Sequence, residues 1–248
     1  MGIKVRPTNN TKRKKTTKSS SSFMGTIRKF ILKFFLFCIA LSLFFVVLFK
    51  FVPVPFTPLM AIRAIEHKKA GKEAVCSHDW EPLENISVNL QKAVIASEDG
   101  NFLNHNGFDF IALQKAYKNN SRGKNIKGGS TISQQTAKNV FLWQGRSYLR
   151  KGLEAYFTVL IELIWGKERI MEVYLNSIEM GDGVYGAQAA AEHWYRKDAS
   201  NLTPIQAAGI AAILPNPRRF TATSSSSYIN RRKTKIVRLM RTVGKIKY

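Results

Sequence analysis

The sequence predicts a mainly α-helical domain that follows a single membrane-spanning helix. Residues 34–49 form an uncharged, largely apolar run, and apolar side chains recur at helical spacing along residues 147–165. Strand-like alternation of apolar and polar residues is weak throughout the chain. The length of 248 residues leaves room for one domain of roughly 200 residues with a buried core, plus appendages.

The N-terminal region predicts a cytoplasmic tail and a membrane anchor. The first 52 residues carry eleven Lys or Arg residues and no acid, within a chain of net charge +23. Residues 1–29 are polar, basic and of low complexity, which predicts disorder. Residues 30–52 are long enough to span a hydrocarbon core of about 30 Å as a helix. The positive-inside rule keeps the tail in the cytoplasm, so we expect the rest of the chain on the outer side of the inner membrane.

Two other interpretations of this region are weaker. A cleaved signal peptide has an apolar part of about 7–15 residues that ends in small residues, whereas this run is longer and ends in KFVPVPFTP. A basic tail could bind nucleic acid, but one placed directly against a membrane span favours anionic lipid. We therefore expect membrane lipids as partners, and no nucleic acid.

The remainder predicts a linker and then a helical domain. Residues 53–85 are expected to be a linker and membrane-proximal segment with a short basic helix, and residues 86–248 the domain. In the last helix, apolar residues on one side indicate packing on the core, with binding to a membrane surface as the alternative. Apolar periodicity, capping residues and prolines predict the helices of the domain at 86–98, 130–142, 147–165, 167–176, 184–195, 203–214 and 228–248.

Two glutamates are candidates for chemistry. Glu98 ends a predicted helix beside Asp99, and partial burial with a neighbouring like charge would raise a carboxyl pKa toward that of a working base. Glu154 follows Arg150 and Lys151 at helical spacings of four and three. On spacing alone, Glu154 is more simply a solvated ion pair.

A third candidate is the start of the helix predicted at 130–142. Thr131, Gln135 and Lys138 share one helical face, and Gly128 and Gly129 precede them. Free backbone N–H groups at a helix start suit an anionic phosphate. The same glycines would equally serve as a flexible hinge. The cysteines add no site, because Cys38 lies inside the predicted span and no Cys/His cluster has the spacing of zinc ligands.

Five stretches occur in the order of the motifs of one enzyme family. They read EDGNFLNHNGFD (98–109), GGSTISQQTAKN (128–139), RKGLE (150–154), IMEVYLNSIEMGDGVYGAQAAAEHWY (170–195) and LTPIQAAGIAAILPNPRRF (202–220). Together they resemble the peptidoglycan glycosyltransferases of glycosyltransferase family 51, the lipid II polymerases. Ser133 stands where Thr is usual and Trp194 where Tyr is more common. The single anchor, without a transpeptidase domain after it, resembles the monofunctional members.

The resemblance implies a lysozyme-like, two-lobed glycosyltransferase domain and an inverting hexosyl transfer. It implies that Glu98 is the general base and Glu154 a second catalytic carboxylate, which orients the cations or a divalent metal such as Mg²⁺ or Mn²⁺ at the pyrophosphate. The substrate-binding residues that it implies are Lys138, Arg146, Arg150, Gln135, Asp99, Ser130, Gln134 and Asn139.

The resemblance also implies the partners. They are lipid II, the growing glycan strand, inner-membrane lipids and other cell-wall synthesis proteins. Residues 108–123 mix apolar and basic groups and are expected to form part of a mobile jaw against the bilayer. A lytic enzyme on the same fold and a non-catalytic wall scaffold remain the alternatives, although an uncharged sugar leaving group would not need the cations.

Overall fold

The computed structural model describes residues 2, 20–120, 129–145 and 147–248, and the chain divides into the units Met1–Phe45 and Val46–Tyr248. Helix α1, Ser20–Phe51, contains the stretch Met24–Phe51, which is long and apolar enough to cross a membrane. The helix begins ten residues before the anchor predicted from residue 30, because no proline interrupts residues 20–29. Most of the predicted disordered tail lies outside the described residues.

The segment predicted as a linker is folded onto the second unit. Thr57 caps helix α2, Pro58–Lys69, and Leu59 and Met60 are buried. Arg63 on α2 donates a hydrogen bond to Glu179, at 3.1 Å. Apolar burial and ion pairing therefore make residues 54–69 part of the domain, in contrast to the predicted boundary at residue 86.

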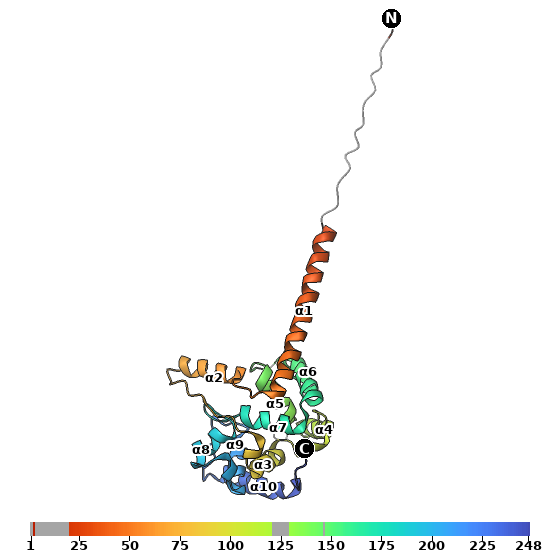
Figure 1. Ribbon diagram of the computed structural model, residues 1–248. Helices are drawn as coiled ribbons and strands as arrows, with labels where there is room; N and C mark the ends of the chain where they lie inside the picture. The colour runs from red at the N-terminus through yellow and green to blue at the C-terminus, as the bar shows by residue number, and fades with distance from the viewer. Residues whose placement is uncertain (1, 3–19, 121–128, 146) are drawn as a thin grey trace. The chain divides into compact units, whose positions relative to one another are not determined.

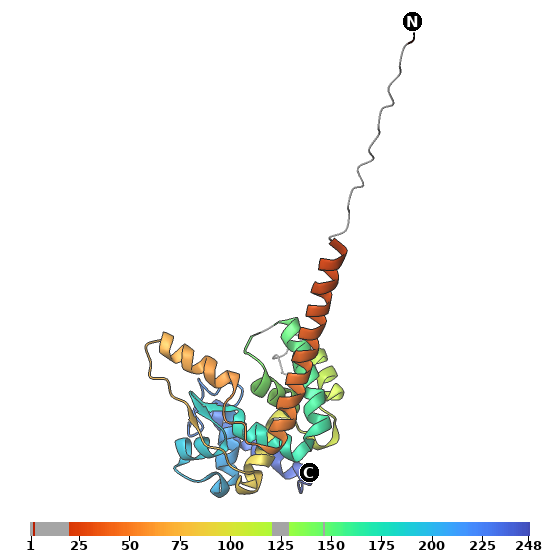
Figure 2. The same cartoon turned by 45° about the horizontal axis from the view of Figure 1, so that its top comes forward.

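Three helices that are distant in sequence form one part of the core. Helices α3, Val88–Glu98, α9, Pro204–Ile213, and α10, Ser227–Val243, contact one another, and both views show the blue α9 and α10 beside the yellow α3 (Figures 1 and 2). Thr203 and Gln206 form a capping box at the start of α9. Ile229, Ile236 and Met240 of α10 are buried, which confirms packing on the core.

A second group consists of α5, Ile132–Phe141, α6, Tyr148–Ile164, and α7, Gly166–Ser177. The rings of Phe141 and Phe157 stack with centroids 4.5 Å apart. The apolar side chains of α6 divide between two faces. Leu149 is 70% exposed and Leu163 is 78% exposed, because only the face with Phe157 and Ile161 packs on neighbouring helices. The face with Leu149 and Leu163 therefore does not pack on the core, and exposed apolar residues of this kind are typical of a contact surface.

A small sheet, which the sequence did not predict, connects these groups. Strands β1, Ser77–His78, β3, Val184–Tyr185, and β2, Glu179–Gly181, lie in the order β1-β3-β2, parallel and then antiparallel. In α8, Ala187–Tyr195, Trp194 donates its indole N–H to Met180 O at 2.8 Å, so the tryptophan is accommodated at this position. The remaining elements are η1, Leu83–Asn85, η2, Phe102–Asn104, α4, Phe110–Asn120, and η3, Ala199–Asn201.

Candidate active site

Glu98 lies at the end of α3 and is held by a neighbouring helix. Its Oε2 accepts a hydrogen bond from Gln135 Nε2 at 3.1 Å, and Tyr174 donates to Gln135 Oε1 at 3.3 Å. Burial raises the pKa of Glu98, and the charge of Asp99 adds to this, whereas Gln135 and Arg232 oppose it. The expected raised pKa is confirmed, with loss of hydration as the main cause. Such a carboxylate is suited to accept a proton.

Asp99, the residue after Glu98, connects the loop that contains His105 to the start of α5 through hydrogen bonds. Its carboxylate accepts hydrogen bonds from Ile132 N and His105 Nε2, both at 2.9 Å. Because Gly107 N donates to His105 Nδ1 at 3.1 Å, the ring proton lies on Nε2. Gly107 has φ of +86°, and a Cβ there would lie 2.7 Å from Thr158 Cγ2, so glycine is required. Asp99 is buried and bonded to these partners, so it holds the end of α3, and with it Glu98, in place.

Of the other polar residues predicted at α5, one stabilises the helix and another lines a cavity. Gln134 is buried, and its Oε1 accepts from Thr131 N at 3.0 Å as half of a capping box, so this side chain is used by the fold. Ser130 is exposed just before the helix. Asn139 is buried and lines a cavity with Gln135 and Lys138.

Glu154 is a buried carboxylate that pairs with two cations, of which Arg150 is buried and Lys151 is half exposed. Arg150 donates to its Oε2 at 2.7 Å and Lys151 pairs with its Oε1. Glu154 is 2% exposed and Arg150 8% exposed, so the interpretation as a solvated ion pair is wrong. Burial lowers the pKa of Lys138, and Arg150 and Lys151 lower it further, whereas Glu154 and Glu98 raise it. The charge of Lys138 therefore interacts with the charges of both Glu154 and Glu98.

The positive charges of Arg150, Lys151 and Lys138 exceed the single negative charge of Glu154, so the group would attract an anion. Arg150 Nε is buried and has no hydrogen-bond partner among the described residues. Arg146, predicted to bind the same anion, lies outside the described residues. Arg232 and Tyr174 join the site without having been predicted, because α10 and α7 reach Glu98 only through tertiary packing.

The residues around Glu154 do not fit a protein-bound divalent cation. Within the described ranges, no three His, Cys, Asp or Glu side chains gather as metal ligands. Both oxygens of Glu154 are already paired with Arg150 and Lys151, whose charges would repel a cation.

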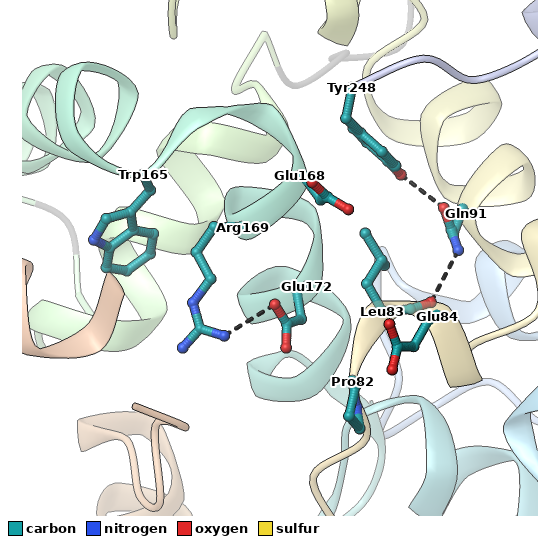
Figure 3. Close-up of a pocket in the computed structure, with 9 residues that line it drawn as sticks. All are labelled: Pro82, Leu83, Glu84, Gln91, Trp165, Glu168, Arg169, Glu172 and Tyr248. Carbon is teal, nitrogen blue, oxygen red and sulfur yellow. Dashed lines mark hydrogen bonds and ion pairs between the residues drawn. The ribbon is translucent and has the colours of Figure 1, made fainter. Parts of the chain in front are cut away.

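A pocket of about 470 Å³ is lined by none of the residues Glu98, Lys138, Arg150 and Glu154 (Figure 3). Tyr248 donates to Gln91 at its edge at 2.8 Å, and Arg169 pairs with Glu172 at 2.9 Å. Glu84 and Glu168 also line it. Because its carboxylates outnumber its guanidinium, this hollow would repel a pyrophosphate.

The fold and the site together define a class of enzyme. A carboxylate with a raised pKa, near a buried arginine and two lysines in a helical domain after an apolar helix, is the arrangement of a glycosyltransferase with an anionic leaving group. Residues 66–241 match the family model described as Transglycosylase. The chain belongs to this transglycosylase family, and its mostly helical structure is consistent with the family's lysozyme-like fold.

Curated relatives carry one name. Each is called a biosynthetic peptidoglycan transglycosylase. The chain is 56% identical to that of Bdellovibrio bacteriovorus over 86% of this chain and 85% of the relative. It is 53% identical to that of Caulobacter vibrioides, over 85% and 89%, and 52% identical to that of Bacteroides thetaiotaomicron, over 85% of both.

Proposed function

We propose that this protein polymerises lipid II into β-1,4-linked glycan strands and releases undecaprenyl pyrophosphate. The observation that carries the proposal is that Lys138 interacts electrostatically with both Glu98 and Glu154, so the candidate base and the ion pairs of Glu154 with Arg150 and Lys151 belong to one site. The names of the relatives support it, because they specify peptidoglycan biosynthesis.

The geometry supports an inverting transfer in one step. Glu98 removes the proton of the acceptor sugar's 4-hydroxyl as that oxygen bonds to the donor's anomeric carbon. The bond from the anomeric carbon to the pyrophosphate oxygen breaks on the opposite side, and its electrons leave with the pyrophosphate. Lys138 and Arg150, with Arg146 proposed as a third cation, stabilise this charge. Glu154 acts by orienting Arg150 and Lys151.

We further propose that the domain works on the outer face of the inner membrane. The apolar helix α1 supports single-pass anchoring, and the basic residues before it support a cytoplasmic N-terminus. A polyprenyl-linked substrate is displayed at that surface. Other cell-wall synthesis proteins at the same membrane are proposed partners.

Exposed apolar side chains on α4 and α6 are the proposed bilayer contact. Phe110 and Ile111 are 72% and 64% exposed on α4, and Leu149 and Leu163 lie fourteen residues apart on one face of α6. We expect a bimane label on Leu163→Cys, with Cys38 and Cys76 replaced by Ser, to be quenched by spin-labelled lipid in proteoliposomes. A label on Tyr228→Cys of α10 is the control. Equal quenching at both positions would refute this contact.

Purified protein supplied with lipid II tests the proposed function. Formation of a long glycan that muramidase digests supports a polymerase. Shortening of preformed glycan would indicate the lytic alternative. A folded protein that makes no polymer from lipid II, and leaves preformed glycan intact, would indicate the scaffold.

The pH dependence should report on Glu98. Below its pKa the carboxyl is protonated and cannot accept the hydroxyl proton, so kcat/KM should fall with falling pH, at a pH above the range of an ordinary glutamate. Gln135 lowers this pKa, so Gln135→Leu should move the acid limb to higher pH. Profiles of kcat/KM from about pH 4 to about pH 9, a range that covers a raised glutamate pKa, measure the shift of the acid limb. Glu192→Gln, exposed on α8, should leave the limb in place, and an unmoved limb in Gln135→Leu would contradict the assignment.

A further inference from the structure

Positive charge is concentrated at the C-terminal end of the folded domain. Residues 227–248, which include α10, contain eight Lys or Arg residues and no Asp or Glu. Residues 53–226 contain twenty Lys or Arg residues and sixteen Asp or Glu residues, so their side chains have a net charge of +4, against +8 for the last 22 residues. The basic character of the domain therefore comes mainly from one helix and the few residues after it.

Four of these cations lie on one exposed side of α10, the cationic face. Ile229, Ile236 and Met240 are buried, and α10 contacts α3 and α9. Successive cations on the opposite side are three or four residues apart, so they are neighbours along the helix. The cationic face consists of residues that are all exposed: Arg231, Thr234, Lys235, Arg238, Arg241 and Thr242.

The charge of the cationic face is not balanced by acidic side chains. The ion pairs between described residues include none of its four cations. Helix α10 has no Asp or Glu of its own. Like charges three or four residues apart on a helix repel one another and destabilise it. An anionic ligand would remove this repulsion, so the face is suited to bind one.

The chemistry of the cationic face distinguishes between anionic partners. Protein interfaces have apolar and aromatic side chains at their centre, but in α10, all of which the structure describes, Tyr228 in the first turn is the one exposed large apolar side chain. A helix that lies in a membrane surface buries its apolar side in the lipid, whereas the apolar side of α10 is already buried in the core. A flexible polyanion that is bound by charge alone fits these features.

Helix α10 also borders the reacting centre. It packs on α3, whose last residue is Glu98, and the charge of its Arg232 interacts with that of Glu98. Arg231, the residue before Arg232, belongs to the cationic face. In the proposed function each unit added at Glu98 carries a peptide, and each peptide ends in a carboxylate. The product is then itself a polyanion, made beside α10.

We propose that the cationic face of α10 binds the peptide carboxylates of the polymerised glycan strand, outside the catalytic site. This inference rests on the proposed function for the identity of the polyanion. Neighbouring cations are roughly 5 Å apart along the helix axis, so a mobile peptide meets several alternative partners and needs no single geometry. Binding by charge keeps the strand on the enzyme between additions, which lengthens the product without any part in the transfer itself.

Binding of preformed strands tests the proposal without turnover. The probe is a fluorescent, uncross-linked glycan strand that carries its peptides, and the comparison strand has the same peptides with their carboxylates converted to methylamides. With the full-length protein in a neutral detergent, we expect the charged strand to bind at least about tenfold more tightly, with an affinity that falls as salt is added. Equal affinity for the two strands would overturn the proposal.

A variant without the four cations should lose this binding and keep its fold. Glutamine is a good helix former and removes the repulsion, so the melting temperature should not fall. We expect the affinity for the charged strand to decrease by about tenfold and to depend less on salt. Affinity of wild-type size would overturn the proposal. The variant combines Arg231→Gln, Lys235→Gln, Arg238→Gln and Arg241→Gln.

A matched control removes the same amount of charge elsewhere on the surface. Four lysines that are exposed on α2, just after it and after α8 take no part in the ion pairs between described residues. Their replacement should leave binding of the charged strand unchanged. An equal loss of affinity in both variants would show an effect of net charge alone and would overturn the proposal. The control combines Lys68→Gln, Lys69→Gln, Lys72→Gln and Lys197→Gln.

The length of the product provides a second readout. The variant without the four cations should consume lipid II at the initial rate of wild type, because the cationic face lies on the side of α10 opposite to α3. It should release shorter strands at low salt, and added salt should shorten the wild-type product toward the same length. Electrophoresis of labelled product measures both effects. Strands of equal length from the two proteins at low salt would contradict retention by α10.

A fluorescent label separates the strand from lipid as the occupant of the face. Bimane on Thr234→Cys, with Cys38 and Cys76 replaced by Ser, should not be quenched by spin-labelled lipid in proteoliposomes. Addition of the charged strand, but not of the methylamide strand, should change its emission. Quenching as strong as that of a label on Leu41→Cys, in the apolar run of α1, would assign the face to lipid headgroups and overturn the proposal.

The binding measurement also distinguishes this inference from the proposed function. A protein that makes no polymer, but binds the charged strand through the four cations of α10, would sustain the binding surface and refute the polymerase. A polymerase whose four-cation variant binds strands and makes product like wild type would do the reverse.

Discussion

Glu98→Gln is expected to slow polymerisation of lipid II by about 10²- to 10⁴-fold, the usual contribution of a general base. The amide has nearly the same shape but cannot take the acceptor's proton. Binding of lipid II should persist, because Lys138 and Arg150 are unchanged. Initial rates with labelled lipid II in detergent, together with equilibrium binding of the same substrate, measure both quantities.

The same variant should not lose stability. The pKa of Glu98 is raised in the folded protein, so its ionisation disfavours folding as the pH rises past the ordinary pKa of a glutamate. Glutamine removes this effect, and the melting temperature at neutral pH should equal or exceed that of wild type. Glu168→Gln, in the hollow of Figure 3, is the control and should retain activity. A Glu98→Gln protein with wild-type rates would show that another group is the base.

Glu154→Ala is expected to destabilise the fold by about 3–5 kcal/mol and to abolish polymerisation. The substitution leaves Arg150 buried without its counter-charge, since Arg150 is 8% exposed and pairs with Glu154 at 2.7 Å. Lys151, whose side chain is half exposed, can turn to solvent. Thermal unfolding followed by circular dichroism should show a fall on the order of 10 °C.

A double variant separates stability from chemistry. Arg150→Met with Glu154→Leu replaces the buried pair by apolar side chains of similar volume and should recover most of the lost stability. It should remain inactive, because the cation that faces the leaving group is gone. A stable, active Glu154→Ala protein would contradict both the buried pair and its role.

Local patterns in the sequence were sufficient for most of the helices, although α4 was not predicted and the helix predicted at 184–195 begins at Ala187, after strand β3. Capping boxes of Thr203 with Gln206 and of Thr131 with Gln134 lie at the starts of helices that were predicted, because a cap involves residues only three apart. The apolar run of α1 required only length and composition. The motifs that contain Glu98, Lys138 and Glu154 were visible for the same reason, since each is contiguous.

The arrangement of the site was beyond such patterns. Spacing alone could not show that Glu154 is buried, because a helical i, i+4 pair looks the same at the surface and in the core. Nor could it show which face of α6 is covered, or that α2 packs on the domain through Arg63 and Glu179. Arg232 and Tyr174 reach Glu98 from helices distant in the chain.

The sequence by itself therefore determined most of the helices, the apolar N-terminal segment and the family of this protein, since these depend on neighbouring residues and contiguous motifs. Only the tertiary structure decided which carboxylates lose water and which cations they meet. The physical reason is that desolvation and charge pairing depend on distances in space, which are set when helices far apart in the chain pack together.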